Sequence, residues 1–210
     1  ALDLNLNLQI VKEKAGFSRS EVVRLLDAAI DLDEKHEQRK WILLLGAYTG
    51  ARLGEIAKLK FTDIKIDQES SIRYILMNSE IGSGKSKNAT RQVPIHSKLL
   101  ELGLDAFLTR QNHHHSLFPD YHGRQRKITA WFPTLMTQLD VPKNNDYHQS
   151  RTFHSFRHSF ITEARSNNHS TDLIQTIVGH EKTSAGQTDV YTGRYSVEKL
   201  KPVVESISYL

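Results

Sequence analysis

Apolar residues recur at helical intervals along most of this chain. After Ser18, the residues Val22, Leu25 and Leu26 fall on one side of a helix. Ser18 and Glu21 form a capping-box pattern, in which each side chain satisfies a backbone N–H of the other residue. We therefore predict that a helix begins after Ser18. The same periodicity predicts further helices at about residues 34–48, 53–59, 97–108, 128–139, 156–166, 171–178 and 197–209.

Three short stretches, 61–66, 72–77 and 92–95, instead alternate β-branched or other apolar residues with polar ones. This pattern predicts strands of a small antiparallel sheet. The segment between the last two, residues 78–91, is rich in glycine, serine and lysine and is predicted to be a flexible, basic hairpin loop. The expected fold class is mainly α with a small antiparallel β-sheet (α+β).

The composition restricts the class of protein. Of the 210 residues, 38% are hydrophobic and 25% are charged, as in an ordinary globular domain. The sequence contains no run of 18 or more apolar residues, the length that a membrane span needs. The absence of cysteine excludes disulfides and thiolate metal sites, and it fits a reducing interior. The net charge of +4 permits nucleic-acid binding without indicating it.

Residues 151–195 contain the side chains best suited to chemistry. His154 and Arg157 are three apart and share a helix face. Gly179 is predicted to end the next helix, so that His180 follows at the turn, and Tyr191 comes eleven residues later. A guanidinium binds phosphate bidentately, an imidazole moves a proton, and a phenol becomes a nucleophile when its phenolate is stabilised. This set fits attack of a tyrosine on a phosphodiester, although the local spacing alone does not establish it.

These motifs resemble the C-terminal half of a tyrosine recombinase (phage integrase) catalytic domain. The family's other motif, an arginine that follows Thr-Gly and stands three residues before a carboxylate, matches the segment from Thr49 through Arg52 to Glu55. The resemblance runs from about Phe17 to the C-terminus, with the motifs in the family's order. It implies the tyrosine recombinase catalytic-domain fold over residues 17–210. Residues 1–16 would be a linker or extension, and the N-terminal DNA-binding domain common in the family would be absent.

The resemblance also assigns roles to individual side chains. Arg52 and Arg157 would hold the non-bridging oxygens of the scissile phosphate, and Glu55 would position Arg52. His154 would serve as base or proton shuttle. His180 would donate a hydrogen bond to the phosphate.

Two roles have alternatives within this chain. Lys87, in the predicted hairpin loop, matches the family's general acid better than Lys85 does. Tyr191 is the expected nucleophile, but the spacing from His180 to Tyr191 is longer than in the family, which leaves Tyr195 as an alternative.

The implied function is site-specific recombination or integration of double-stranded DNA through a 3′-phosphotyrosine intermediate. No cofactor or metal is expected. The resemblance implies a homo-tetramer on DNA, or a monomer for an isolated domain. The protein would be bacterial or from a phage and would act in the cytoplasm, in association with the nucleoid. The alternatives are relaxation of DNA like that of a type IB topoisomerase, and a DNA-binding regulator without catalysis. A metal-dependent nuclease that uses the histidines is a third.

Two further features have competing interpretations. The adjacent histidines 113–115, and the pair His154 and His158, suggest metal ligands. We interpret neither set as a metal site, because adjacent loop histidines rarely converge on one ion and the helical pair lacks a carboxylate ligand nearby.

The amphipathic C-terminal stretch is expected to pack either on its own domain or on a neighbouring protomer.

Overall fold

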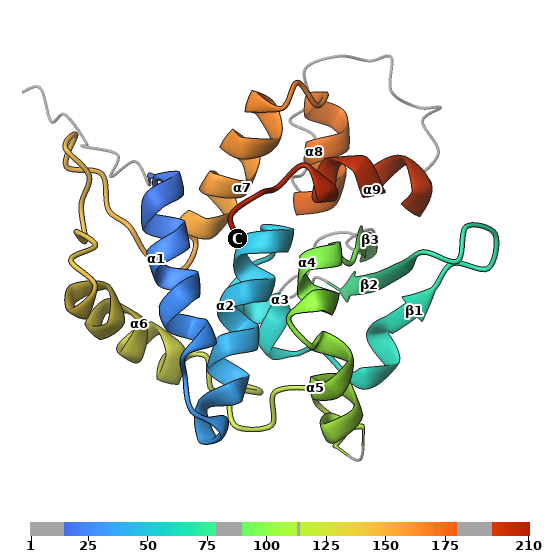
Figure 1. Cartoon of the computed structure of the whole chain (residues 1–210), viewed down its shortest axis with the longest axis horizontal. Coiled ribbons are helices and arrows are strands. Elements are labelled where there is room, and N and C mark those ends of the chain that lie inside the picture. Colours follow the sequence, from blue (N-terminus) through green and yellow to red (C-terminus); the bar gives the residue numbers. More distant parts are fainter. Residues whose placement is uncertain (1–14, 79–89, 113, 180–194) are drawn as a thin grey trace, which may run out of the picture.

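The protein is mainly helical, with a small sheet at one side (Figure 1). The computed structural model describes residues 15–78, 90–112, 114–179 and 195–210. Its helices are α1 Arg19–Ile30, α2 Glu37–Thr49, α3 Leu53–Ala57, α4 Ser97–Glu101, α5 Leu104–Gln111, α6 Arg126–Gln138, α7 Ser155–Ser166, α8 Thr171–Val178 and α9 Val197–Glu205. None of the helices in these ranges is both long and apolar enough to cross a membrane. The predicted fold class is confirmed.

Helix α2 is the centre of the core. All nine of its residues from Trp41 to Thr49 are buried, and it packs against both α1 and α7. Helix α1 begins as its capping box predicts, because Ser18 Oγ accepts a hydrogen bond from the backbone of Glu21 at 3.3 Å and the Glu21 carboxylate accepts one from the backbone of Ser18 at 2.8 Å. A short 3-10 turn, Glu34–His36, precedes α2, so α2 begins later than predicted.

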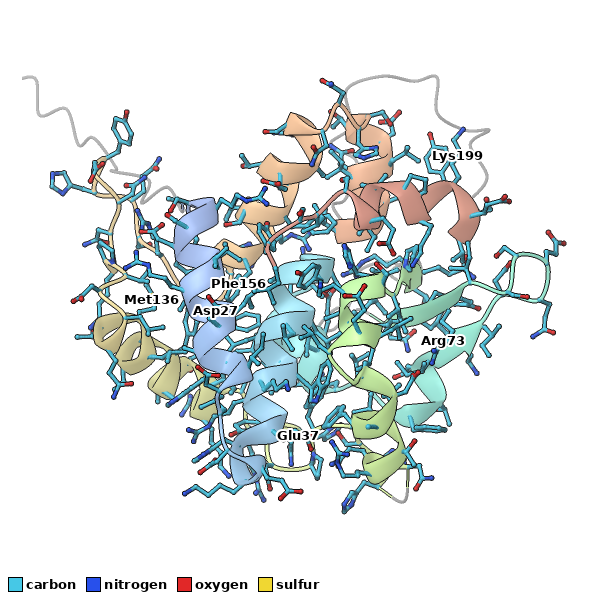
Figure 2. All side chains as sticks on the ribbon, in the orientation of Figure 1. Asp27, Glu37, Arg73, Met136, Phe156 and Lys199 are labelled. Carbon is cyan, nitrogen blue, oxygen red and sulfur yellow. The ribbon has the colours of Figure 1, made fainter. Side chains whose placement is uncertain are left out.

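Four aromatic rings fill the space between α6 and α7. They contact one another mostly edge to face, with centroids 5.2–6.1 Å apart. The rings are those of Phe17, Phe132, Phe153 and Phe156. Phe156, which is fully buried, lies in the interior of the helical layer (Figure 2).

The sheet is antiparallel, in the order β1 (Ile64–Ile66), β2 (Arg73–Asn78), β3 (Thr90–Pro94). Ile75, on the central strand, pairs with Ile64 on one side and Val93 on the other. Two predicted boundaries were wrong. Residues 61–63 form a 3-10 turn, in which Asp63 accepts a hydrogen bond from the backbone of Lys60 at 2.9 Å. Residues 90 and 91 belong to β3 and not to the loop before it.

Three predicted helices are shorter than their apolar patterns suggested. The helix expected at 97–108 is divided into α4 and α5 at Gly103, whose φ of 91° is left-handed. Helix α3 ends at Ala57, and the carbonyl of Leu59 instead accepts a hydrogen bond from Leu117 at 2.8 Å. Helix α9 ends at Glu205, beyond which alternate residues of an extended tail are buried.

Helix α9 packs on its own domain, over β3 and α8 (Figure 1). Lys201 Nζ donates a hydrogen bond to the carbonyl of Ile95 at 2.6 Å. The carboxylate of Glu205 accepts hydrogen bonds from the backbone and the hydroxyl of Ser97, at 2.9 and 2.6 Å. The tail then brings Tyr209 against Tyr48 of α2, with ring centroids 5.8 Å apart.

Candidate active site

Arg157 connects two helices that are far apart in the sequence. Its side chain leaves the first turn of α7, and only 1% of the residue is exposed. Nη1 donates a hydrogen bond of 2.9 Å to the carbonyl oxygen of Gly50, the residue that caps the C-terminus of α2. The end of α2, and with it the segment that carries Arg52, is therefore fixed against α7.

Gly50 occupies a position that favours glycine. Its φ of 60° is left-handed, a conformation in which a side chain costs about 1–2 kcal/mol. A Cβ atom there would also lie 3.0 Å from Cγ1 of Val178 and 3.2 Å from the ring of Phe160. The backbone of Gly50 thus lies directly against α7 and α8, where these helices meet α2.

Arg52 stands just after this junction and just before α3. Its backbone N–H donates to Glu55 Oε2 at 2.8 Å, and its Nη1 lies 3.3 Å from Glu55 Oε1. The Arg52 side chain is 46% exposed, whereas that of Glu55 is buried. The ion pair expected from the sequence is present, and the guanidinium remains accessible to an anion from solvent.

A third arginine, which the sequence analysis did not single out, completes the cluster. Arg91 of β3 donates from Nη1 to Glu55 Oε1 at 2.9 Å and from Nη2 to Glu55 Oε2 at 2.8 Å. Its Nε donates to the carbonyl of Ile177, in the last turn of α8, at 2.6 Å. The prediction that Arg91 lies in a basic loop is wrong, because Arg91 belongs to β3. The strand alternation could have identified it, since Arg91 lies two residues before the buried Val93 and therefore on the same face.

The side chains of Arg52, Glu55, Arg91 and Arg157 form a cluster with an excess of positive charge. Burial raises the pKa of Glu55, but its hydrogen bonds to Arg91 and the charges of Arg91 and Arg52 outweigh burial and lower it. Glu55 is therefore an anion among three guanidinium groups. Burial, and then repulsion by Arg52 and Arg91, lowers the pKa of Arg157 to about 10, which leaves it charged at neutral pH.

Arg157 also has unused donors. Its Nε and Nη2 are buried and have no hydrogen-bond partner within the described ranges. A buried charged group without partners is costly, and a guanidinium binds phosphate or carboxylate through two parallel hydrogen bonds. The buried, partly unpaired Arg157 beside the accessible Arg52 therefore forms an arrangement suited to a bound anion such as a phosphate diester.

His154 lies at the same end of α7 as Arg157. It is the residue before the helix, and its carbonyl accepts a hydrogen bond from the backbone of Arg157 at 3.1 Å. Its ring is half-buried and stands edge to face with that of His158, with centroids 5.2 Å apart. In the part of the chain that the structure describes, no three histidine or carboxylate side chains form a group that could hold a metal ion.

Of the six predicted site residues, the structure describes three, Arg52, His154 and Arg157. It brings the charges of Arg52 and Arg157 close together and places His154 at the same end of α7 as Arg157. The other three, Lys87, His180 and Tyr191, lie outside the described residues, as does Lys85. The alternative nucleophile Tyr195 is described. Its ring packs partly buried against the core, with Lys199 Nζ 5.5 Å from its centroid.

Comparison with known proteins identifies the family. The model of the phage integrase family matches residues 17–196. The integrase of Escherichia phage P2 is 31% identical over 181 residues, which are 86% of this chain and 43% of that protein. The tyrosine recombinase XerD of Oceanobacillus iheyensis is 26% identical over 196 residues, which are 90% of this chain and 60% of XerD. The chain therefore spans about half the length of these curated relatives.

Solved structures show the same fold at low identity. The XerH site-specific recombinase, in its pre-cleavage complex with the difH substrate, superposes with a TM-score of 0.61 at 19% identity and covers 92% of this chain and 50% of that one. The integrase of mycobacterium phage Brujita gives a TM-score of 0.61 at 21% identity, with 91% and 57% covered. By the match of its motifs and of residues 17–196 to the family model, this chain belongs to the phage integrase family.

Proposed function

We propose that residues 17–210 form the catalytic domain of a site-specific DNA recombinase that cuts and rejoins strands through a 3′-phosphotyrosine. The observation that carries this proposal is the buried Arg157, which has two unpaired nitrogens within the described ranges and lies close enough to the accessible Arg52 for the two charges to repel each other. A phosphodiester supplies the non-bridging oxygens that such donors bind. Membership of the phage integrase family supports the same reaction.

The two arginines act on the charge of the phosphate. As a nucleophile adds, negative charge grows on the non-bridging oxygens, and fixed guanidinium donors stabilise it without reorganisation. Arg157 is held by Gly50 and Arg52 by Glu55, so both donors are positioned before the substrate arrives. The loss of one such donor is expected to slow cleavage on the order of 10²–10³-fold.

The remaining steps move two protons. The phenol oxygen of Tyr191 forms a bond to phosphorus while the bond from phosphorus to the 5′ oxygen breaks. His154 accepts the phenol proton, Lys87 protonates the departing 5′ oxygen, and His180 donates a hydrogen bond to the phosphate. We favour Tyr191 over Tyr195 because the ring of Tyr195 is already packed against the core. The 5′ hydroxyl of a partner strand reverses these steps, and the preserved ester bond removes any need for ATP.

The proposed partner is duplex DNA. The XerH relative was crystallised on its difH substrate, and a homo-tetramer that joins two duplexes is the assembly that strand exchange requires. We place this reaction on bacterial or phage DNA in the nucleoid.

Covalent trapping tests the proposal. Duplexes built from the ends of the protein's own genetic element, nicked so that a short fragment is lost after cleavage, are incubated with the protein in the presence of a chelator. We expect a protein–DNA adduct on a denaturing gel from the wild type and none from Tyr191→Phe. Relaxation of supercoiled plasmid without recombination sites would favour topoisomerase chemistry, and binding without an adduct would favour a regulator. Cleavage that depends on metal would favour a nuclease.

A further inference from the structure

The geometry points to Arg91 as a positioning residue that keeps Arg52 available to the scissile phosphate by occupying Glu55. This inference rests on the proposed function, because it deepens the role of the same site. Arg91 is buried and belongs to β3, one residue after the first residue of that strand. It acts through Glu55 and Arg52 and not on the DNA itself.

Glu55 is bound more closely by Arg91 than by Arg52. Both carboxylate oxygens accept hydrogen bonds from Arg91, at 2.9 and 2.8 Å. The guanidinium of Arg52 reaches the same carboxylate through a single longer contact of 3.3 Å. Arg91 therefore has the bidentate pairing, and most of the guanidinium donors of Arg52 have no hydrogen-bond partner among the described residues.

The charge of Arg91 balances that of Glu55. Arg91 and Glu55 neutralise each other in the interior, so the charges of Arg52 and Arg157 remain for an anion. Without Arg91, a buried carboxylate would remain and Arg52 would be its nearest described cation. Since a buried carboxylate strongly favours a paired cation, the Arg52 guanidinium would close onto Glu55 and turn away from the substrate.

A second contact connects Arg91 to the end of α8. Its Nε donates to the carbonyl of Ile177 at 2.6 Å. A Cβ atom on Gly179, which ends α8 with a left-handed φ of 71°, would lie 2.9 Å from Nη1 of Arg91. One guanidinium thus touches both the residue that positions Arg52 and the turn that immediately precedes His180.

The test separates a positioning role from simple packing. Single-turnover cleavage of the nicked duplexes is measured for the wild type, Arg91→Met, Glu55→Gln and the double variant Arg91→Met with Glu55→Gln. Arg73→Met is the matched control, because Arg73 lies on the neighbouring strand β2 and pairs with the exposed Asp105 (Figure 2). Circular dichroism and thermal melting establish that each variant is folded.

We expect Arg91→Met to slow cleavage about 100-fold, because Arg52 would no longer be available as a preorganised phosphate donor. Arg73→Met should leave the rate within about threefold of the wild type. The double variant should recover at least about tenfold over Arg91→Met, because it no longer contains a buried carboxylate to sequester Arg52. A merely structural role predicts that the double variant is as slow as Arg91→Met or slower. That result, or wild-type cleavage by Arg91→Met, would overturn the inference.

Two further measurements keep the test decisive. If Arg91→Met does not fold, Arg91→Lys replaces it, since lysine keeps the charge but cannot bond both carboxylate oxygens and Ile177 together. If the wild type forms no adduct, the proposed function fails, and binding of inorganic phosphate is measured by 31P NMR instead. Weaker binding in the single variant that the double variant restores supports the role of Arg91, and equal binding in all variants overturns it.

Discussion

Nη1 of Arg157 donates a hydrogen bond of 2.9 Å to the carbonyl oxygen of Gly50, across 107 residues of sequence. This contact joins the two arginine-bearing motifs directly. The separation of the two guanidinium groups therefore depends on how α2 ends as much as on α7. The same contact satisfies only one nitrogen of Arg157 and leaves Nε and Nη2 without a described partner.

Arg157→Met is expected to separate stability from activity. The substitution removes a buried cation and replaces it with an apolar side chain of similar length, a change that is often neutral or stabilising. It also removes the donor to Gly50, which contributes about 0.5–1.5 kcal/mol. We expect a melting temperature equal to or above that of the wild type, and cleavage slower by on the order of 10²–10³-fold. A clear fall in melting temperature would mean that Arg157 is mainly structural.

Gly50→Ala is expected to destabilise the protein. The left-handed backbone costs about 1–2 kcal/mol with a side chain, and overpacking against Val178 and Phe160 adds about 1–3 kcal/mol. Gly103→Ala is the matched control, because Gly103 is also left-handed but a Cβ atom there would meet nothing within 4 Å. Denaturant unfolding should show a larger loss at Gly50 than at Gly103. Equal losses would argue that packing at the helix junction is loose.

Much of the fold follows from local signals in the sequence. The capping box at Ser18 and the left-handed Gly50 mark helix ends correctly, because each depends on a residue's own backbone preferences. Gly103 divides a helix that its apolar pattern predicted to be continuous. Tyr209 continues a helical apolar pattern, yet it is buried from an extended tail whose path is set by contact with Tyr48. The burial of Tyr209 therefore depends on a tertiary contact, which the periodicity of the sequence does not reveal.

The site was predictable in its motifs but not in its connections. The pairing of Arg52 with Glu55 is local and follows from a spacing of three residues. The role of Arg91 depends on β3 lying beside α3 and α8, which no local pattern specifies. A charged residue on the inward face of a strand was the available signal, and it was obscured because Arg91 follows a run rich in glycine and lysine.

The buried His96 is expected to make stability depend on pH. Burial lowers the pKa of His96 more than the charge of Glu205 raises it. Protonation is thus harder in the folded protein than in the unfolded chain, where the pKa of histidine is about 6.5. The contribution of His96 to the free energy of unfolding is therefore complete above about pH 6.5 and decreases as the pH falls below that value.

His96→Asn isolates this effect, because asparagine can still cap α4 in place of the ring nitrogen that accepts from Lys98. The other histidines contribute equally to both proteins and cancel in the difference. Between pH 8 and pH 5, the free energy of unfolding of the wild type should fall relative to that of the variant. A difference independent of pH would show that His96 titrates normally.

Identifying the residue that becomes covalently bound to DNA tests the proposed recombinase reaction. The adduct trapped on a nicked duplex is digested with protease and nuclease, and the nucleotide-bearing peptide is sequenced by mass spectrometry. We expect a phosphotyrosine linkage at Tyr191, formed in the presence of chelator and reduced on the order of 10²–10³-fold in Arg52→Met. Attachment at Tyr195 would correct the nucleophile and keep the reaction. Absence of an adduct on DNA that the protein binds would show that the chain does not cleave DNA through a tyrosine.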